Sequence, residues 1–290
     1  VVIREGDTLA SLKKKVETAA IIGTLQATLT DFRYLRNLWK RNTEEEALLG
    51  LSMTGIMDHP TLGNSSDKTK QWLEELKEVA ITTNKIWAEK LGIAQSVAIT
   101  CVKPSGTVSQ LVDSASGIHP RFSKQYIRRV RSDKKDPLAV FMEDKGFPVE
   151  QDVMSPASAV FSFPVKAPEK SVTVAEVGAM QQLELWKTYQ NHWCEHKPSI
   201  TVYYTDSEFL QVAQWIWDNF EICSGISLLP VSDHVYQQAP YEDISIEKYN
   251  ELLAAMPQGV SWEDLENFEQ EDNTTGSQEL ACTGGACEIV

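Results

Sequence analysis

Three continuous apolar runs constrain the fold of this 290-residue chain more than any other feature. They cover residues 96–102, 199–204 and 225–230, and β-branched side chains are frequent in them. A run of this length and composition is typical of a strand that is covered on both faces. Amphipathic helical patterns separate the runs, including one from Asp67 to Leu91 that Gly92 ends. This alternation predicts an α/β body with mainly parallel strands.

Further patterns predict the remaining elements. One long helix is expected from residue 9 to residue 39, with Asp7 or Thr8 as its N-cap. Asp206 and Ser207 should cap another helix, and a last helix should span 246–256 before Pro257. A short buried strand is expected over 49–55.

The first residues, Val1–Arg4, are expected to be the end of a strand. No initiator Met precedes them, and a helical pattern follows at once. The chain is therefore predicted to be a fragment of a longer protein, or one half of a split one.

The charge of the chain is −14 and is unevenly distributed, since no Lys or Arg follows Lys248. A protein that binds a nucleic-acid duplex should carry a basic patch, so this balance argues against that function. The one dense basic cluster is Arg128–Arg131, which is either a solvated face or an anion contact. There is no apolar run long enough to span a membrane and no signal-peptide pattern, so we expect a cytoplasmic protein with no membrane partner.

The five cysteines fall into two groups. Cys101, Cys194 and Cys223 lie in apolar surroundings and are expected to be inert and buried. Cys282 and Cys287 lie in a polar, Gly-rich terminus that cannot bury them. A structural zinc site would need a second pair of ligands. A redox carrier is therefore favoured over an accidental pair.

The composition also predicts two domains. Residues 1–257 should form the body, and residues 258–290 should form a flexible acidic tail that carries the dithiol. Apolar density is low beyond Pro257, and residues 267–280 are expected to lack stable structure in isolation.

The strongest internal motif is Lys103-Pro-Ser-Gly-Thr-Val-Ser109, directly after the run 96–102. A strand followed by a loop of Pro, Gly and hydroxyl residues and then by a helix start is suited to bind an anion through backbone N–H groups. Gly106 allows a phosphate to approach the backbone closely. The Gly-Lys-Ser/Thr ending of a P-loop is absent, and a plain helix cap is the alternative.

The histidines give weaker signals. His119, in Ser116-Gly-Ile-His-Pro120, has no partner at metal-ligand spacing. His192 and His196 stand four residues apart with Glu195 beside them, but the His-Glu-x-x-His order of zinc proteases is absent. These residues are expected to be structural or to shape a substrate site, and no metal site is predicted.

Several segments together resemble the C-terminal half of the monomeric, adenosylcobalamin-dependent (class II) ribonucleoside-triphosphate reductases. The tail Cys282-x-x-x-x-Cys287 resembles the C-terminal dithiol of that family. The resemblance covers nearly the whole chain, and the combination is specific although each segment alone is weak. The segments are Lys103–Ser109, Gly117–Pro120, Tyr126–Arg131, Pro198–Val202 and Tyr236–Glu242.

The resemblance implies a ten-stranded α/β barrel, with this chain supplying the later strands and helices. It also implies reduction of ribonucleotides at C2′ by a thiyl radical that adenosylcobalamin generates. A cysteine pair then supplies the reducing equivalents, the tail dithiol restores that pair, and thioredoxin or a similar dithiol restores the tail.

The resemblance also assigns residues to roles. Cys282 and Cys287 would be the redox shuttle. The substrate phosphates would bind Pro104, Ser105, Gly106, Thr107, Val108 and Ser109. Cobalamin would bind near Gly117, Ile118, His119, Pro120, Tyr236, Gln238, Pro240 and Tyr241.

One departure from the family is large. The Asn-Pro-Cys-Gly-Glu segment with the radical cysteine is absent, and so are the two substrate-reducing cysteines and the N-terminal effector site. We therefore expect a thioredoxin-dependent reductase fragment that needs the N-terminal portion of the enzyme and is inactive alone. The alternative is a stand-alone, dithiol-bearing, nucleotide-binding module without radical chemistry.

Overall fold

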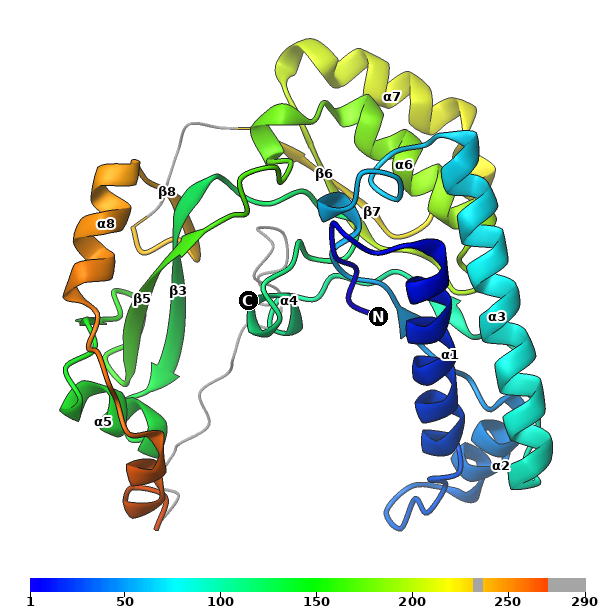
Figure 1. Cartoon of the computed structure of the whole chain (residues 1–290), viewed down its shortest axis with the longest axis horizontal. Helices are drawn as coiled ribbons and strands as arrows, with labels where there is room; N and C mark the ends of the chain where they lie inside the picture. The colour runs from blue at the N-terminus through cyan, green and yellow to red at the C-terminus, as the bar shows by residue number, and fades with distance from the viewer. Residues whose placement is uncertain (232–236, 271–290) are drawn as a thin grey trace. The chain divides into compact units, whose positions relative to one another are not determined.

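The computed structural model describes residues 1–231 and 237–270 (Figure 1). These residues form two compact units. The first unit comprises Val1–Arg121 and Val174–Val231, and the second comprises Phe122–Thr173 and the described residues after 231. The chain therefore has two units within the range 1–257, where the sequence predicted one body.

The first unit has the parallel strands that the apolar runs predicted. Its strands are β1 (Leu51–Ser52), β2 (Thr100–Cys101), β6 (Ile200–Tyr204) and β7 (Ile226–Pro230). β1 pairs with β2, β6 pairs with β7, and Val2 forms a bridge with Thr54, all in parallel. A 3.0 Å hydrogen bond from the Ser199 N–H to the Val102 carbonyl joins the two pairs. Only the end of the run 96–102 is a strand, since the Val97 side chain is 70% exposed.

The helices of the first unit follow the predictions in part. They are α1 (Leu9–Gln26), α2 (Asn37–Glu46), α3 (Asp67–Leu91), α4 (Val108–Leu111), α6 (Ala179–His192) and α7 (Phe209–Asp218). The bounds predicted for α3 are confirmed, and Gly92 ends it with a φ of 68°. Thr8 caps α1 as predicted.

Two helix predictions were wrong. The single helix expected over 9–39 ends at Gln26, where the Thr28 hydroxyl donates to the Leu25 carbonyl at 2.7 Å and competes with the helical pattern. Asp206 and Ser207 do not cap the next helix. They lie in a 3₁₀ turn, Asp206–Glu208, that Thr205 caps before α7 begins.

The core of the first unit lies between the strands and helices α1, α3 and α6. α1 and α3 pack side by side (Figure 1). On α6, Trp186 and Tyr189 are fully buried, as is Trp193 just beyond its end. The Trp193 indole N–H donates to the Cys101 carbonyl at 2.8 Å, and the Trp186 indole N–H donates to the Pro198 carbonyl at 3.3 Å. These two bonds attach α6 and the residue after it to β2 at Cys101 and to the chain just before β6 at Pro198.

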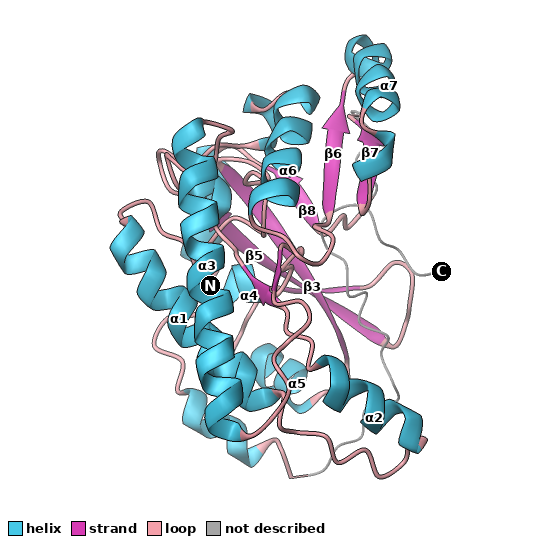
Figure 2. Cartoon of the chain, turned by 90° about the vertical axis from the view of Figure 1, so that its right-hand side faces the viewer, coloured by secondary structure: helices cyan, strands magenta, loops and turns pink. Residues whose placement is uncertain are grey.

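The second unit is antiparallel, which the sequence did not predict. Its sheet has the order β4 (Val149–Gln151), β5 (Ser158–Lys166), β3 (Gln125–Asp133) and β8 (Tyr241–Asp243), in which β5 and β3 are the long strands of Figure 2. β3 and β5 pair along nine residues, from Gln125 opposite Lys166 to Asp133 opposite Ser158. The expectation of mainly parallel strands therefore holds only for the first unit. The helices are α5 (Pro137–Asp144) and α8 (Ile246–Ala255), and the latter begins where predicted and ends one residue before Met256.

The start of the expected tail is folded onto the second unit. A 3₁₀ helix, η5 (Trp262–Asn267), follows α8, and Val260, Leu265 and Phe268 pack against the cluster around Phe141. The prediction of a flexible tail from residue 258 is therefore wrong as far as Phe268, because apolar side chains with helical spacing are interspersed among the carboxylates. Cys282 and Cys287 lie outside the described residues. Among the described helices, none combines the length and apolar character needed to cross a bilayer.

Candidate functional site

Residues 103–109, here called the anion loop, connect β2 to the single turn of α4. The Lys103 side chain points away from the rest of the loop, since its ammonium donates to the Lys197 carbonyl at 2.7 Å. Its backbone N–H donates to Ser52 Oγ at 3.0 Å. Thr107 stands at the N-cap of α4 but makes no side-chain capping bond. The cap interpretation therefore has no hydrogen bond to support it.

The six predicted substrate-binding residues divide into two groups. Ser109 is buried and its hydroxyl donates to the Ser105 carbonyl, so both serines belong to the interior of the loop. Pro104, Thr107 and Val108 are exposed, and Gly106 is partly exposed. Within the part of the chain that the structure describes, the N–H groups of residues 106–108 donate no hydrogen bond. Three consecutive open donors are a suitable arrangement for an anion.

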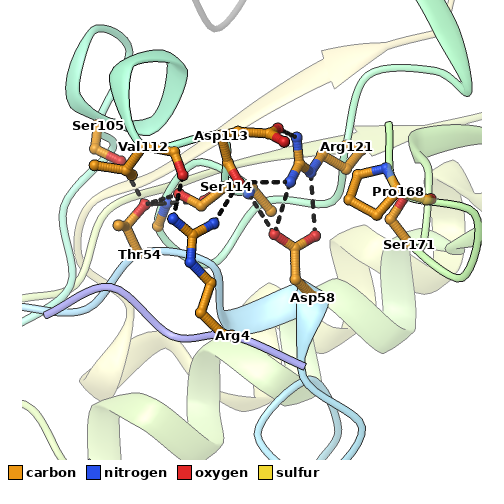
Figure 3. Close-up of polar contacts among 12 residues, drawn as sticks. Arg4, Thr54, Asp58, Ser105, Val112, Asp113, Ser114, Arg121, Pro168 and Ser171 are labelled. Carbon is orange, nitrogen blue, oxygen red and sulfur yellow. Dashed lines mark hydrogen bonds and ion pairs between the residues drawn. The ribbon is translucent and has the colours of Figure 1, made fainter. Parts of the chain in front are cut away.

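Thr54 links the anion loop to a second loop, residues 113–120 (Figure 3). Its hydroxyl oxygen lies 2.7 Å from Ser105 Oγ, 2.9 Å from the Ala115 carbonyl and 3.0 Å from the Gly117 N–H. In addition, the Ser105 N–H donates to Ser116 Oγ at 2.9 Å. The two loops therefore form one hydrogen-bonded body with the end of β1.

The predicted cofactor segment Gly117–Pro120 lies in this second loop and is mostly internal. Gly117 has a φ of 55°, and Ile118 is 1% exposed. The backbone N–H of Thr201 donates to His119 Nε2 at 2.9 Å, so His119 Nδ1 carries the proton and donates to the Ser116 carbonyl at 2.9 Å. Burial lowers the pKa of His119 below its usual value. His119 is therefore a neutral residue with both nitrogens occupied.

The other two histidines also have partners within the chain. His192 Nδ1 lies 2.8 Å from a Glu74 carboxylate oxygen, and His196 Nε2 lies 2.7 Å from the Leu49 carbonyl. The Glu195 carboxylate accepts the Ile99 N–H at 2.8 Å. These contacts support the structural interpretation of both histidines. Among the described residues, no group of three or more His, Cys, Asp or Glu side chains could hold a metal ion.

A buried ion-pair network supports the second loop, and sequence reasoning missed it. The Arg121 guanidinium, 4% exposed, binds both carboxylate oxygens of Asp58 at 3.0 and 3.1 Å and binds Asp113 at 2.7 Å. Asp58 also accepts the Ala115 N–H at 2.8 Å. Arg4 donates to the Asp113 carbonyl at 2.6 Å (Figure 3). Two-point arginine–carboxylate pairing of this kind is strong and directional, so it fixes the loop that carries Ala115 and Gly117.

The arginine cluster of β3 is not a solvated face, because its guanidinium groups bind other parts of the chain. Arg129 and Arg131 each donate at 2.9 Å to a backbone carbonyl, those of Ala239 and Gln238. Arg129 also pairs with the Glu242 carboxylate at 2.5 Å. The arginines thus hold residues 238–242, which contain several predicted cofactor-binding residues.

The predicted cofactor-binding residues of this segment differ in how much of their surface is exposed. Gln238 is buried at a φ of 58°, and its side-chain amide bonds the Val153 N–H and the Gln151 carbonyl. Pro240 and Tyr241 are half-buried, and the Arg128 guanidinium lies 4.9 Å from the centre of the Tyr241 ring. Tyr236 lies outside the described residues.

The cysteines of the first unit fit the expectation of inert residues in two of three cases. Cys101 and Cys194 are 3% and 7% exposed, and burial raises the pKa of each thiol. Cys223 is only partly buried, although burial raises its pKa too. Neutral thiols are poor nucleophiles.

Comparison with known proteins gives one consistent result. An adenosylcobalamin-dependent ribonucleoside-triphosphate reductase of Lactobacillus delbrueckii subsp. bulgaricus is 30% identical over 291 residues, which cover 89% of this chain and 38% of the relative. One of Euglena gracilis is 30% identical over 229 residues, covering 77% of this chain and 31% of the relative. No family model matches the chain. The chain thus resembles the C-terminal portion of these enzymes and spans less than two fifths of their length.

A solved structure extends the similarity to the fold. The crystal structure of a B12-dependent (class II) ribonucleotide reductase matches with a TM-score of 0.73 at 23% identity, covering 89% of this chain and 39% of that one. The predicted fold class, part of an α/β barrel, is confirmed.

Proposed function

We infer that this chain is the C-terminal part of an adenosylcobalamin-dependent ribonucleoside-triphosphate reductase and that it acts with the N-terminal portion of the same enzyme. The observation that carries this proposal is the agreement of sequence and fold with that family over 89% of the chain. The proposed reaction replaces the 2′-hydroxyl of a ribonucleotide by hydrogen, releases water and oxidises two thiols to a disulfide.

The anion loop is proposed to bind the substrate phosphates. The N–H groups of Gly106, Thr107 and Val108 supply three donors, and the exposed Thr107 side chain can add a fourth. Ser105 and Ser109 hold the loop in place through internal hydrogen bonds. This narrows the six-residue assignment to the residues whose donors are open.

Most of the predicted cofactor-binding residues that the structure describes are better suited to support the binding site than to contact the cofactor directly. Gly117, Ile118 and His119 are enclosed by their own loop, whereas Pro240 and Tyr241 keep exposed surface. Adenosylcobalamin, when bound by the complete enzyme, supplies the radical that starts the reaction. This chain's residues would hold the surrounding backbone, through the Arg121–Asp58 pair in the first unit and through Arg129 in the second.

Cys282 and Cys287 are proposed to be the shuttle that renews the active-site dithiol. In thiol–disulfide exchange their two thiols become a disulfide while the active-site disulfide becomes two thiols. Thioredoxin, or a similar dithiol, then reduces the tail disulfide and is itself oxidised. The low apolar density and high acidity of residues 271–290 agree with a terminus that works in water.

Reconstitution tests the proposal most directly. The chain would be mixed with the upstream portion of the reductase, adenosylcobalamin, thioredoxin and a ribonucleoside triphosphate, and deoxynucleotide formation would be measured. Product should form in the mixture and not with either part alone. Turnover by this chain alone would contradict the division of roles. A folded mixture without product, in which the chain alone binds nucleotide, would favour the stand-alone binding module.

Two substitutions test the anion loop in the reconstituted enzyme. Thr107→Val removes one hydroxyl donor and should cost about 1–2 kcal/mol, or roughly tenfold in nucleotide affinity. Gly106→Val should weaken binding further, because its side chain obstructs the approach to the backbone donors. Unchanged affinity in both variants would remove the assignment of the anion loop to the substrate phosphates.

A further inference from the structure

Thr54 occupies a central position between the anion loop and the loop 113–120, although it faces no open surface. It is 6% exposed, and its hydroxyl lies within 3.0 Å of polar atoms on Ser105, Ala115 and Gly117. We propose that Thr54 is a positioning residue, which holds the anion loop in the shape that receives a polyphosphate. The inference rests on the proposed function of that loop, and it names a residue that the sequence motifs do not include.

The direction of each hydrogen bond follows from the chemistry of the partners. The Ala115 carbonyl can only accept and the Gly117 N–H can only donate, so the Thr54 hydroxyl gives its one hydrogen to Ala115 and accepts from Gly117. The remaining lone pair of Thr54 Oγ1 then accepts the hydroxyl hydrogen of Ser105.

This assignment leaves Ser105 without a donor for a ligand. Its hydroxyl hydrogen is directed at Thr54, and its backbone N–H is directed at Ser116 Oγ. Ser105 is therefore the attachment point of the anion loop, and residues 106–108 are its binding part. The position of their open N–H groups depends on how firmly Thr54 and Ser116 hold Ser105.

Thr54 itself is held on several sides. Its N–H donates to the Val1 carbonyl at 2.9 Å, and its carbonyl accepts the Ile3 N–H at 2.8 Å, as part of the parallel bridge. The Asp58 carboxylate binds the Ala115 N–H, and Arg121 holds Asp58 in turn. The hydroxyl therefore lies at a fixed point of the first unit, which is what a positioning residue requires.

A matched set of variants separates positioning from general stability. Thr54→Val keeps the shape of the side chain but leaves the Gly117 N–H and the Ala115 carbonyl without this partner. Thr54→Ser keeps the hydroxyl. Thr24→Val is the control, because Thr24 is likewise a buried threonine of the first unit whose hydroxyl is hydrogen-bonded, donating to Ala20 at 2.7 Å and accepting from Asn84 at 3.0 Å.

The experiment uses the full chain and two measurements. Hydrogen exchange followed by NMR reports the protection of the Ser105 and Gly117 amides, and calorimetry reports the affinity for inorganic tripolyphosphate. Thr54→Val should raise both exchange rates about tenfold and weaken tripolyphosphate binding by a similar factor, the loss expected for one buried hydrogen bond. Thr54→Ser should stay within about threefold of the wild type in both measurements. Thr24→Val should lower the unfolding midpoint without changing either one.

Each result decides a separate point. If Thr54→Val and Thr24→Val change loop exchange and binding equally, Thr54 is only a stability residue and the inference is overturned. The same follows if the wild-type chain binds tripolyphosphate and Thr54→Val binds it equally well. If the wild-type chain does not bind tripolyphosphate, the proposed phosphate role of the anion loop fails. The exchange rates then still decide whether Thr54 fixes the loop.

Discussion

A methyl group added to Gly117 would lie 2.7 Å from the Lys103 carbonyl oxygen and 3.3 Å from the carbonyl carbon. Gly117 also has a φ of 55°, a conformation that side chains with a Cβ rarely adopt. Gly92 provides a matched control, because its φ is 68° but nothing lies within 4 Å of the added methyl. Substitution by Ala therefore imposes the same backbone penalty at both positions and a close contact at only one.

The two penalties can be separated in magnitude. The left-handed conformation costs an Ala about 1–2 kcal/mol, and the smaller freedom of Ala in the unfolded chain returns about 0.4–1 kcal/mol. Gly92→Ala should therefore lower the free energy of unfolding by about 1 kcal/mol. At Gly117 the rigid backbone of the anion loop must also move, for which overpacking of about 1–3 kcal/mol is a fair guide. Gly117→Ala should then cost about 2–4 kcal/mol in all.

Urea unfolding followed by tryptophan fluorescence measures this difference. Trp262 is the one tryptophan outside the first unit, so the signal comes chiefly from the unit that contains both glycines. The two variants should share the denaturant slope of the wild type and differ in midpoint. If Gly117→Ala is no less stable than Gly92→Ala, the close approach of the two loops is not a constraint and the reasoning is refuted.

Three further predictions concern pH, the second unit and the tail. Because burial lowers the pKa of His119 from its usual 6.5, its contribution to stability is complete above pH 6.5 and declines as pH falls below that value. The loss of stability between pH 7.5 and 5.5 should thus be smaller in His119→Asn, and an equal loss would contradict the assignment. Phe268→Ala should cost about 1–2 kcal/mol and speed amide exchange in η5, whereas unchanged exchange would mean that this packing contributes nothing. Cys282→Ser and Cys287→Ser should each abolish repeated thioredoxin-driven turnover of the reconstituted enzyme but spare a single pre-reduced turnover, and persistent turnover in both would remove the shuttle assignment.

Local patterns predicted those elements of the first unit that follow local rules. The amphipathic spacing and the final glycine gave the bounds of α3, and the apolar runs located β6 and β7. The anion loop was proposed as a candidate site for the same reason, since its Pro, Gly and hydroxyl residues are adjacent in the sequence.

The partners that hold the site could not be predicted in the same way. Arg121 and Asp58 are 63 residues apart, and nothing in either neighbourhood specifies the other. The contacts of the β3 arginines could not be predicted either, since their carbonyl acceptors at Gln238 and Ala239 lie more than 100 residues further along the chain. A basic cluster has no local signature that separates a solvated face from a clamp on another segment. Only tertiary pairing decides it.

The packing of η5 changes what the proposed shuttle requires. Phe268 is held against the second unit, and Cys282 lies fourteen residues further along the chain. A fully extended chain covers at most about 3.6 Å per residue, so the first thiol can travel no further than about 50 Å from Phe268. A tether starting at residue 258 would have reached about 85 Å. Under the proposed shuttle function, the disulfide that the tail would reduce and the surface where thioredoxin would meet the tail must both lie within the shorter radius. Shortening the chain between Phe268 and Cys282 should therefore impair turnover well before it affects folding of either unit.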